Sequence, residues 1–331
     1  MIAGNSSESG LPKTLSQKGQ MTSTHEQEIL QGLSAQPKQL SPKFFYDQRG
    51  SELFDQICDL PEYYLTRTEL KIMRRCLPDV AKRIGPKAAI IEFGAGSNLK
   101  VRQLLEHMID PTAYVPVEIS GTYLAEQAED LANDFPDLSI KPVVADFTQA
   151  FELPTHAEMP RRNLVFFPGS TIGNFTRHQA RALLANMAAE AKPGGALLIG
   201  VDLRKDTALI EAAYNDDQGV TAEFNRNALR VLNNEHGATF ELDAFRHEAV
   251  FDNEESRIEM RLISTKPQTV SIANHDFAFR KDEYIITEYS HKYSIADFTA
   301  LAREAGFEPE ACYTDGDELF SLHYMTVPNV A

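Results

Sequence analysis

Short apolar segments alternate with helical segments between residues 88 and 201, and this alternation constrains the fold more than any other feature of the sequence. The first apolar segment, residues 88–93, ends at a glycine and is typical of a buried strand. Strands and helices that alternate at this spacing form a parallel sheet with helices on both faces, so we predict an α/β fold. The predicted strands are 88–93, 113–118, 140–146, 164–167 and 196–201, and the predicted helices are 101–108, 124–133 and 176–191.

The pattern changes on either side of this region. Residues 1–25 are rich in Ser, Gly, Gln and Thr and have little apolar periodicity, which is typical of a disordered leader. Residues 206–234 are predicted to be helical, and strand-like stretches follow at 259–263 and 284–289. We therefore predict an α+β lobe inserted into the parallel-sheet domain. That domain resumes with a helix over 295–306 and a closing strand over 319–327.

The net charge of −16 at pH 7 limits the range of partners. An acidic surface repels nucleic acid phosphates and anionic lipids, so we expect neither nucleic acid nor a membrane as a partner. The sequence has no run of 18 apolar residues and its N-terminus lacks the features of a secretory signal, so we expect a cytoplasmic protein. The three cysteines are widely spaced and the nine histidines show no ligand spacing, so we expect no disulfide framework and no metal site.

Three predicted strand ends carry residues suited to a nucleoside ligand, and ligands of open α/β sheets bind at the carboxyl ends of the strands. The turn EFGAGS at residues 92–97 follows the first strand, and a dinucleotide fingerprint would need a glycine at Leu99, which disfavours NAD. Glu118 ends the second strand, where a carboxylate can accept both ribose hydroxyls. Asp146 and Phe147 end the third strand, where they can bind and cover an adenine. A turn, a solvated carboxylate and a helix cap explain each one alone, but together they resemble the class I methyltransferases, whose cofactor is S-adenosylmethionine.

Two further segments carry residues that can bind a polar substrate. Asn174 lies in the segment 168–175 after the fourth strand, at the edge that faces the transferred methyl group, although a plain turn is the alternative. Glu288 and Ser290 share one face of a predicted strand and can hold an imidazole by its two nitrogens. Met260, on a neighbouring predicted strand, can pack against a flat ring, although an amphipathic strand with a buried Met also explains the pattern.

Several longer motifs are more specific than the glycine turn. They are FYDQRGSELFD (45–55), PEYYLTR (61–67), GSTIGN (169–174), DLRKD (202–206), GVTAEFNRN (219–227), RIEM (257–260) and TEYSHK (287–292). Together they resemble the histidine-specific Nα-methyltransferases of ergothioneine biosynthesis over about residues 25–331. Glu118 stands where that family often has Asp, and Leu65 stands where it often has Pro.

This resemblance implies roles for individual residues. S-adenosylmethionine would be bound by Gly94, Lys100, Glu118, Asp146 and Phe147. Tyr46 and Tyr63 would be the catalytic residues, and their aromatic faces favour a nitrogen that becomes quaternary. The substrate would be bound by Tyr63, Gly169, Asn174, Tyr214, Met260, Glu288 and Ser290, of which the last three would recognise the imidazole.

The resemblance also implies the activity, which is three successive methyl transfers to the α-amino nitrogen of L-histidine, giving hercynine. We expect a monomer with a substrate-binding domain over 26–67 and 205–293 and a methyltransferase domain over 68–204 and 294–331. Two alternatives stay open, namely an Nα-methyltransferase for another amino acid such as tryptophan and a non-catalytic S-adenosylmethionine-binding protein. The carboxylate of Glu288 favours imidazole, and the intact motif at 169–174 favours catalysis.

Overall fold

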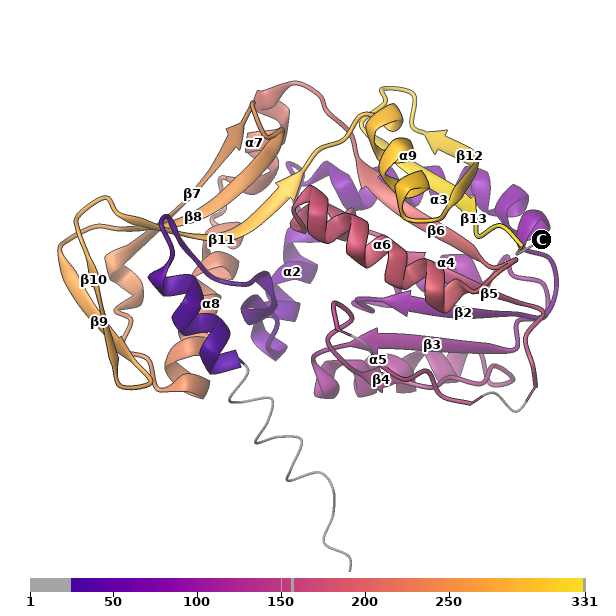
Figure 1. Ribbon diagram of the computed structural model, residues 1–331, viewed down its shortest axis with the longest axis horizontal. Coiled ribbons are helices and arrows are strands. Elements are labelled where there is room, and N and C mark those ends of the chain that lie inside the picture. The colour runs from indigo at the N-terminus through magenta and orange to yellow at the C-terminus, as the bar shows by residue number, and fades with distance from the viewer. Residues whose placement is uncertain (1–24, 150, 156–157, 330–331) are drawn as a thin grey trace, which may run out of the picture.

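The computed structural model describes residues 25–149, 151–155 and 158–329 (Figure 1). The predicted leader over residues 1–25 lies outside this range except for its last residue, which begins a helix that extends to residue 34. Within these ranges, no helix is both long enough and apolar enough to cross a membrane.

The main sheet has the strand order β12-β13-β6-β5-β2-β3-β4 (Figure 1). Its parallel strands are β2 (Ala88–Phe93), β3 (Ala113–Glu118), β4 (Val143–Val144), β5 (Arg162–Phe167) and β6 (Ala196–Asp202). β13 (Phe320–Thr326) pairs antiparallel with β6, and β12 (Glu308–Thr314) pairs antiparallel with β13. The predicted α/β fold with a central parallel sheet is confirmed, and the closing strand joins that sheet in the antiparallel direction.

Both faces of the main sheet are buried, because side chains of its strands point alternately to two layers of helices. On one face, Ile90, Leu164, Phe166 and Leu198 share a core with residues of α3 (Tyr64–Ile84), α4 (Leu99–Leu105) and α5 (Gly121–Asp134). On the other face, Ile91, Val165, Phe167 and Ile199 share a core with residues of α6 (Arg177–Ala191) and α9 (Ile295–Glu304). Burial on both faces explains why these strands are continuous apolar runs rather than alternating ones.

The second lobe is built on a smaller sheet with the strand order β1-β11-β8-β7 (Figure 1). Its strands are β1 (Lys38–Gln39), β7 (Phe245–Asp252), β8 (Arg257–Ser264) and β11 (Tyr284–His291), beside the hairpin of β9 (Gln268–Ile272) and β10 (His275–Phe279). Its helices are η1 (Pro42–Phe45), α2 (Gln48–Asp59), α7 (Thr207–Tyr214), α8 (Val220–His236) and η3 (Leu242–Ala244). β1 pairs with β11 and α2 packs on α8, so two distant parts of the chain form this lobe together.

The prediction of one helix over residues 206–234 is wrong, because the chain forms α7 and α8 with a break at residues 215–219. Asp216 accepts hydrogen bonds from the backbone N–H groups of Val220 and Thr221 at 2.9 and 2.8 Å. Gly219 adopts a φ of 74°, in the left-handed region. Asp216 thus satisfies two of the free N–H groups at the start of a new helix, and Gly219 supplies the turn before it. The third predicted strand, 140–146, is also shorter than expected, because only β4 pairs as a ladder with β3.

Candidate active site

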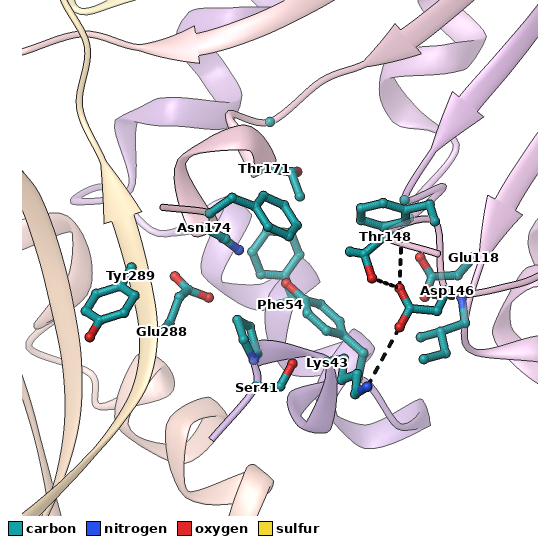
Figure 2. Close-up of a pocket in the computed structure, with 18 of the residues that line it drawn as sticks. Ser41, Lys43, Phe54, Glu118, Asp146, Thr148, Thr171, Asn174, Glu288 and Tyr289 are labelled. Carbon is teal, nitrogen blue, oxygen red and sulfur yellow. Dashed lines mark hydrogen bonds and ion pairs between the residues drawn. The ribbon is translucent and has the colours of Figure 1, made fainter. Parts of the chain in front are cut away.

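A cleft of about 840 Å³ lies between the carboxyl edge of the main sheet and the second lobe. Figure 2 shows Glu118 and Asp146 at one end of the cleft and Asn174 and Glu288 at the other, with Phe54 between them. The predicted residues that line the cleft are Tyr46, Tyr63, Gly94, Lys100, Glu118, Asp146, Phe147, Gly169, Asn174 and Glu288. Three other predicted residues, Tyr214, Met260 and Ser290, are buried behind this lining.

The glycine turn after β2 forms a close contact with the third strand end. Gly94 has a φ of 69°, and a Cβ atom there would lie 3.2 Å from Cε1 of Phe147. The N–H of Gly94 donates to the carbonyl of Val117 at 2.9 Å, which ties the turn to β3. Any larger residue at position 94 would be strained and would crowd Phe147, which lines the cleft.

Glu118 and Asp146 place two carboxylates at successive strand ends. Glu118 Oε1 accepts hydrogen bonds from the N–H groups of Ile119 at 2.8 Å and Ser120 at 3.3 Å, and burial raises the pKa of its carboxyl group. Asp146 Oδ1 accepts from the backbone N–H and the hydroxyl of Thr148, at 3.0 and 2.5 Å (Figure 2). Both side chains are therefore held in place by local hydrogen bonds and still line the cleft.

Lys43 also reaches the end of the cleft that holds Glu118 and Asp146, and no sequence pattern predicted it. Its Nζ lies 3.7 Å from Oδ2 of Asp146 (Figure 2) and also pairs with Glu28. Because Lys43 belongs to η1 and Asp146 follows β4, this ion pair joins the second lobe to the main sheet across the cleft.

Lys100 is positioned by a buried carboxylate that the sequence analysis also missed. Its Nζ lies 2.7 Å from Oε2 of Glu69, which is fully buried on α3 and also accepts hydrogen bonds from the N–H of Gly169. Burial lowers the pKa of Lys100, but the charge and the hydrogen bond of Glu69, with smaller contributions from Cys58 and Glu92, together outweigh burial and raise it, so the side chain is an ammonium. Glu69 thus connects Lys100, on α4, to Gly169 in the loop after β5. The available signal was that Glu69 stands at helical spacing between the apolar residues Leu65 and Ile72.

The loop after β5 approaches β11 closely. It continues into η2 (Thr171–Asn174), where a Cβ atom on Gly173 would lie 2.8 Å from the carbonyl oxygen of His291. Nδ1 of His291 donates to the carbonyl of Gly173 at 2.8 Å. This contact holds Asn174 near the strand that carries Glu288.

Tyr46, Phe54 and Tyr63 form one wall of the cleft, and Tyr214 lies behind Tyr63. The ring centroids of Tyr46 and Phe54 are 6.0 Å apart, those of Phe54 and Tyr63 are 6.3 Å apart, and those of Tyr63 and Tyr214 are 6.2 Å apart. Phe54, which the sequence analysis did not single out, completes this series. Burial raises the pKa of the Tyr46 and Tyr63 phenols well above the usual value, so both stay neutral and neither is an anionic base.

The predicted imidazole residues share one face of the smaller sheet. Glu288 is the register partner of Met260, and Ser290 lies two positions further along β11. Burial raises the pKa of Glu288 to about 7, and the charge of Lys292 opposes that shift. The hydroxyls of Ser290 and Tyr214 are 2.8 Å apart, so these two predicted residues contact each other directly.

These features fit an adenosyl cofactor at the end of the cleft formed by β2, β3 and β4. The open glycine turn leaves room for a ligand against the backbone, and the two carboxylates can accept hydrogen bonds from hydroxyl and amino groups. In residues 25–149, 151–155 and 158–329, no cluster of three or more His, Cys, Asp or Glu side chains could hold a metal ion. The strand order and this site define a class I S-adenosylmethionine-dependent methyltransferase.

The comparisons with known proteins specify the family. The model of the family "Histidine-specific methyltransferase, SAM-dependent" matches residues 25–327, and the chain belongs to this family. Histidine N-alpha-methyltransferase of Mycolicibacterium smegmatis is 39% identical over 300 residues, which cover 89% of this chain and 92% of that protein. Ergothioneine biosynthesis protein 1 of Neurospora crassa is 30% identical over 299 residues, which cover 87% of this chain and 33% of that longer protein.

A solved S-adenosylmethionine-dependent methyltransferase from Clostridium acetobutylicum aligns with 83% of this chain and 98% of its own, at 11% identity and a TM-score of 0.49. The predicted family, the predicted cofactor and the prediction of an enzyme are confirmed by the family match. The assignment of individual residues to substrate and cofactor stays a prediction.

Proposed function

We propose that this protein transfers three methyl groups in succession from S-adenosylmethionine to the α-amino nitrogen of L-histidine, giving hercynine for ergothioneine biosynthesis. The observation that carries the proposal is that one continuous cleft joins the carboxylates after β3 and β4 to the buried carboxylate of Glu288. A cofactor at one end and an imidazole at the other would bring the methyl group and the α-nitrogen together beside the aromatic wall.

In this arrangement the two ends of histidine bind different elements. Asn174, Gly169, Tyr63 and Tyr214 would bind the amino and carboxylate groups, and Lys100 would approach the methionine part of the cofactor. Glu288 would accept a hydrogen bond from one imidazole nitrogen, Ser290 would serve the other, and Met260 would pack against the ring. Since indole offers a single N–H group, a site with two polar partners suits imidazole better than the side chain of tryptophan.

The sulfonium of the cofactor supplies an electrophilic methyl group, and the chain has to present a neutral amine in line with it. Holding the two reactants in this geometry is worth about 7–11 kcal/mol. Over three transfers the α-nitrogen exchanges its three ammonium protons for three methyl groups. Because Tyr46 and Tyr63 stay protonated, we assign these protons to water rather than to a phenolate. The rings of both tyrosines would favour the trimethylammonium product through cation–π contact.

We further propose that the protein acts as a cytoplasmic monomer on free histidine, with no nucleic acid or membrane partner. The net charge of −16 supports the absence of nucleic acid and membrane partners, because it repels polyanions. The division into a substrate-binding domain (26–67 and 205–293) and a methyltransferase domain (68–204 and 294–331) is part of the same proposal. It is supported by the pairing of β1 with β11 and the packing of α2 on α8.

Mass spectrometry tests the proposal directly. The purified protein is incubated with S-adenosylmethionine and each standard amino acid in turn, and the products are followed over time. We expect mono-, di- and trimethylhistidine from histidine and no product from the others. Faster methylation of tryptophan, or methylation of an imidazole nitrogen instead of the α-nitrogen, would contradict it.

A further inference from the structure

Lys292 lies just beyond β11, and its side chain is fully buried. Its Nζ contacts three oxygens: Oδ2 of Asp202 at 2.7 Å, Oγ of Ser290 at 2.9 Å and Oη of Tyr214 at 3.0 Å. Burial lowers the pKa of Lys292, but Asp202 and Tyr214 outweigh burial and raise it, so the side chain is an ammonium. Two of its three partners are residues that we assign to the substrate.

The number of available protons determines which of these groups donate hydrogen bonds and which accept them. An ammonium has three donors and no acceptor, so Ser290 and Tyr214 both accept from Lys292. The two hydroxyl oxygens are also 2.8 Å apart, so one of them donates to the other. Two hydroxyl protons are therefore present, one is used between the pair, and a single proton is left to donate elsewhere.

We propose that Lys292 is a positioning residue that makes the Ser290–Tyr214 pair a hydrogen-bond donor toward the substrate. This inference rests on the proposed function, because it takes the imidazole to lie beside Ser290 and Glu288. With Tyr214 as the donor within the pair, the proton left over is that of Ser290. The ring nitrogen that faces Ser290 must then be unprotonated, and the nitrogen that faces Glu288 must carry its hydrogen. The site would select neutral imidazole in one tautomer, since imidazolium has two N–H groups and no acceptor.

The charge of Lys292 also acts on Glu288. The titratable groups that face Glu288 within the described chain are the phenols of Tyr46, Tyr63 and Tyr214 and the ammonium of Lys292. Burial raises the pKa of all three phenols, so they stay neutral and Lys292 supplies the positive charge. An ionised Glu288 accepts the imidazole N–H more strongly than a protonated one does, and Lys292 lowers the pKa that burial has raised.

Asp202 connects Lys292 to a second lysine, which provides a matched control. Lys205 Nζ lies 2.6 Å from Oδ1 of Asp202 and 2.7 Å from the hydroxyl of Tyr64, and that hydroxyl itself donates to Asp202. Lys205 therefore pairs with the same carboxylate as Lys292, yet none of its hydrogen bonds within the described chain goes to Ser290 or Tyr214. Asp202 also keeps two partners when Lys292 is replaced.

The experiment compares Lys292→Met with Lys205→Met through the pH dependence of kcat/KM for histidine. For Lys292→Met we expect a KM for histidine raised about tenfold or more, because hydrogen bonds to the substrate lose their orientation. We also expect the fall of kcat/KM on the acid side of its pH profile (its acid limb) to occur at higher pH than in the wild type. The reason is that Glu288 loses the cation that keeps it ionised. Lys205→Met should keep the acid limb of the wild type. Because the substrate titrates identically in all assays, a difference between profiles reports the protein.

Calorimetric binding of S-adenosylmethionine shows whether each variant is folded, and we expect wild-type affinity. Lys292→Met/Asp202→Asn removes both charges of the Lys292–Asp202 pair together, and it should show the same displaced acid limb. Equal profiles for Lys292→Met and Lys205→Met, with normal histidine turnover by the wild type, would overturn the role of Lys292 alone. Absence of histidine methylation by the wild type would instead overturn the proposed function, and this inference with it.

Discussion

Gly173 and His291 are joined by a 2.8 Å hydrogen bond from Nδ1 of the histidine to the carbonyl of the glycine. Gly173 belongs to η2 at the edge of the main sheet, and His291 ends β11 of the second lobe. This side chain–backbone contact helps to fix the spacing between the loop that carries Asn174 and the strand that carries Glu288.

Replacing Gly173 by alanine should disturb that spacing. A Cβ atom at this position would lie 2.8 Å from a backbone oxygen, which a flexible side chain cannot relieve. We expect kcat/KM for histidine to fall by about tenfold or more, since small misplacements of a substrate are costly, with little change in cofactor affinity. Gly316→Ala is the matched control, because no atom lies within 4 Å of a Cβ atom there. Equal activity of the two variants would contradict the importance of this contact.

Removing the carboxylate of Glu118 should weaken the binding of S-adenosylmethionine. A ribose hydroxyl left without a charged acceptor costs about 1.5–3 kcal/mol, so calorimetry should show a clearly weaker affinity of Glu118→Ala for S-adenosylmethionine. Glu118→Asp keeps the carboxylate and should retain most of the affinity. If Glu118→Ala binds the cofactor as the wild type does, our assignment of this end of the cleft is wrong.

Removing the carboxylate of Glu288 should change the choice of substrate. Glu288→Ala leaves an imidazole N–H without an acceptor, so KM for histidine should rise, and the site should tolerate apolar aromatic amino acids better. Met260→Val in the same chain should make room for a larger ring. The measurement is the ratio of kcat/KM for histidine to that for tryptophan, with cofactor affinity as the control. An unchanged ratio would refute the specificity role and leave the methyltransferase activity untouched.

The buried carboxylate of Glu288 should make the ligand-free protein less stable at neutral and alkaline pH than at acid pH. Burial raises the pKa of Glu288 from 4.5 to about 7, so the folded state binds its proton more tightly than the unfolded state does. Stability from this group is fully present below pH 4.5 and is lost as pH rises through about 7. Glu288→Gln should therefore gain stability over the wild type at pH 8, on the order of 2–3 kcal/mol, and gain less at pH 5. Urea unfolding of both proteins at the two pH values checks this, and an equal difference at both would contradict it.

Patterns within short segments predicted much of this structure. The strands β2 and β3 were predicted at their observed bounds, because apolar runs buried on both faces are distinctive and a glycine follows the first. Residues at strand ends, such as Glu118 and Asp146, could be placed in one site because parallel strands end at the same edge.

The buried ionic contacts could not be predicted in this way. Lys292 and Asp202 contact each other although they are far apart in the chain, and Lys43 reaches Asp146 from another lobe. In the sequence, a charged residue that forms an ion pair in the interior cannot be distinguished from one on the surface, so only the tertiary structure separates the two. The helical region after residue 206 was misjudged for a related reason, because the Asp216 side chain overrides a periodic pattern.

The pairing of β1 with β11 bears on how substrate choice can be exchanged between relatives. Residues 38–39 contribute a strand to the sheet that carries Glu288, and α2 packs on α8 from the same N-terminal segment. A chimera that takes only β11 and α8 from a relative would pack them against the β1 and α2 of this chain, which belong to another sequence. We therefore expect that a graft of substrate choice from a relative works only when both segments are exchanged together.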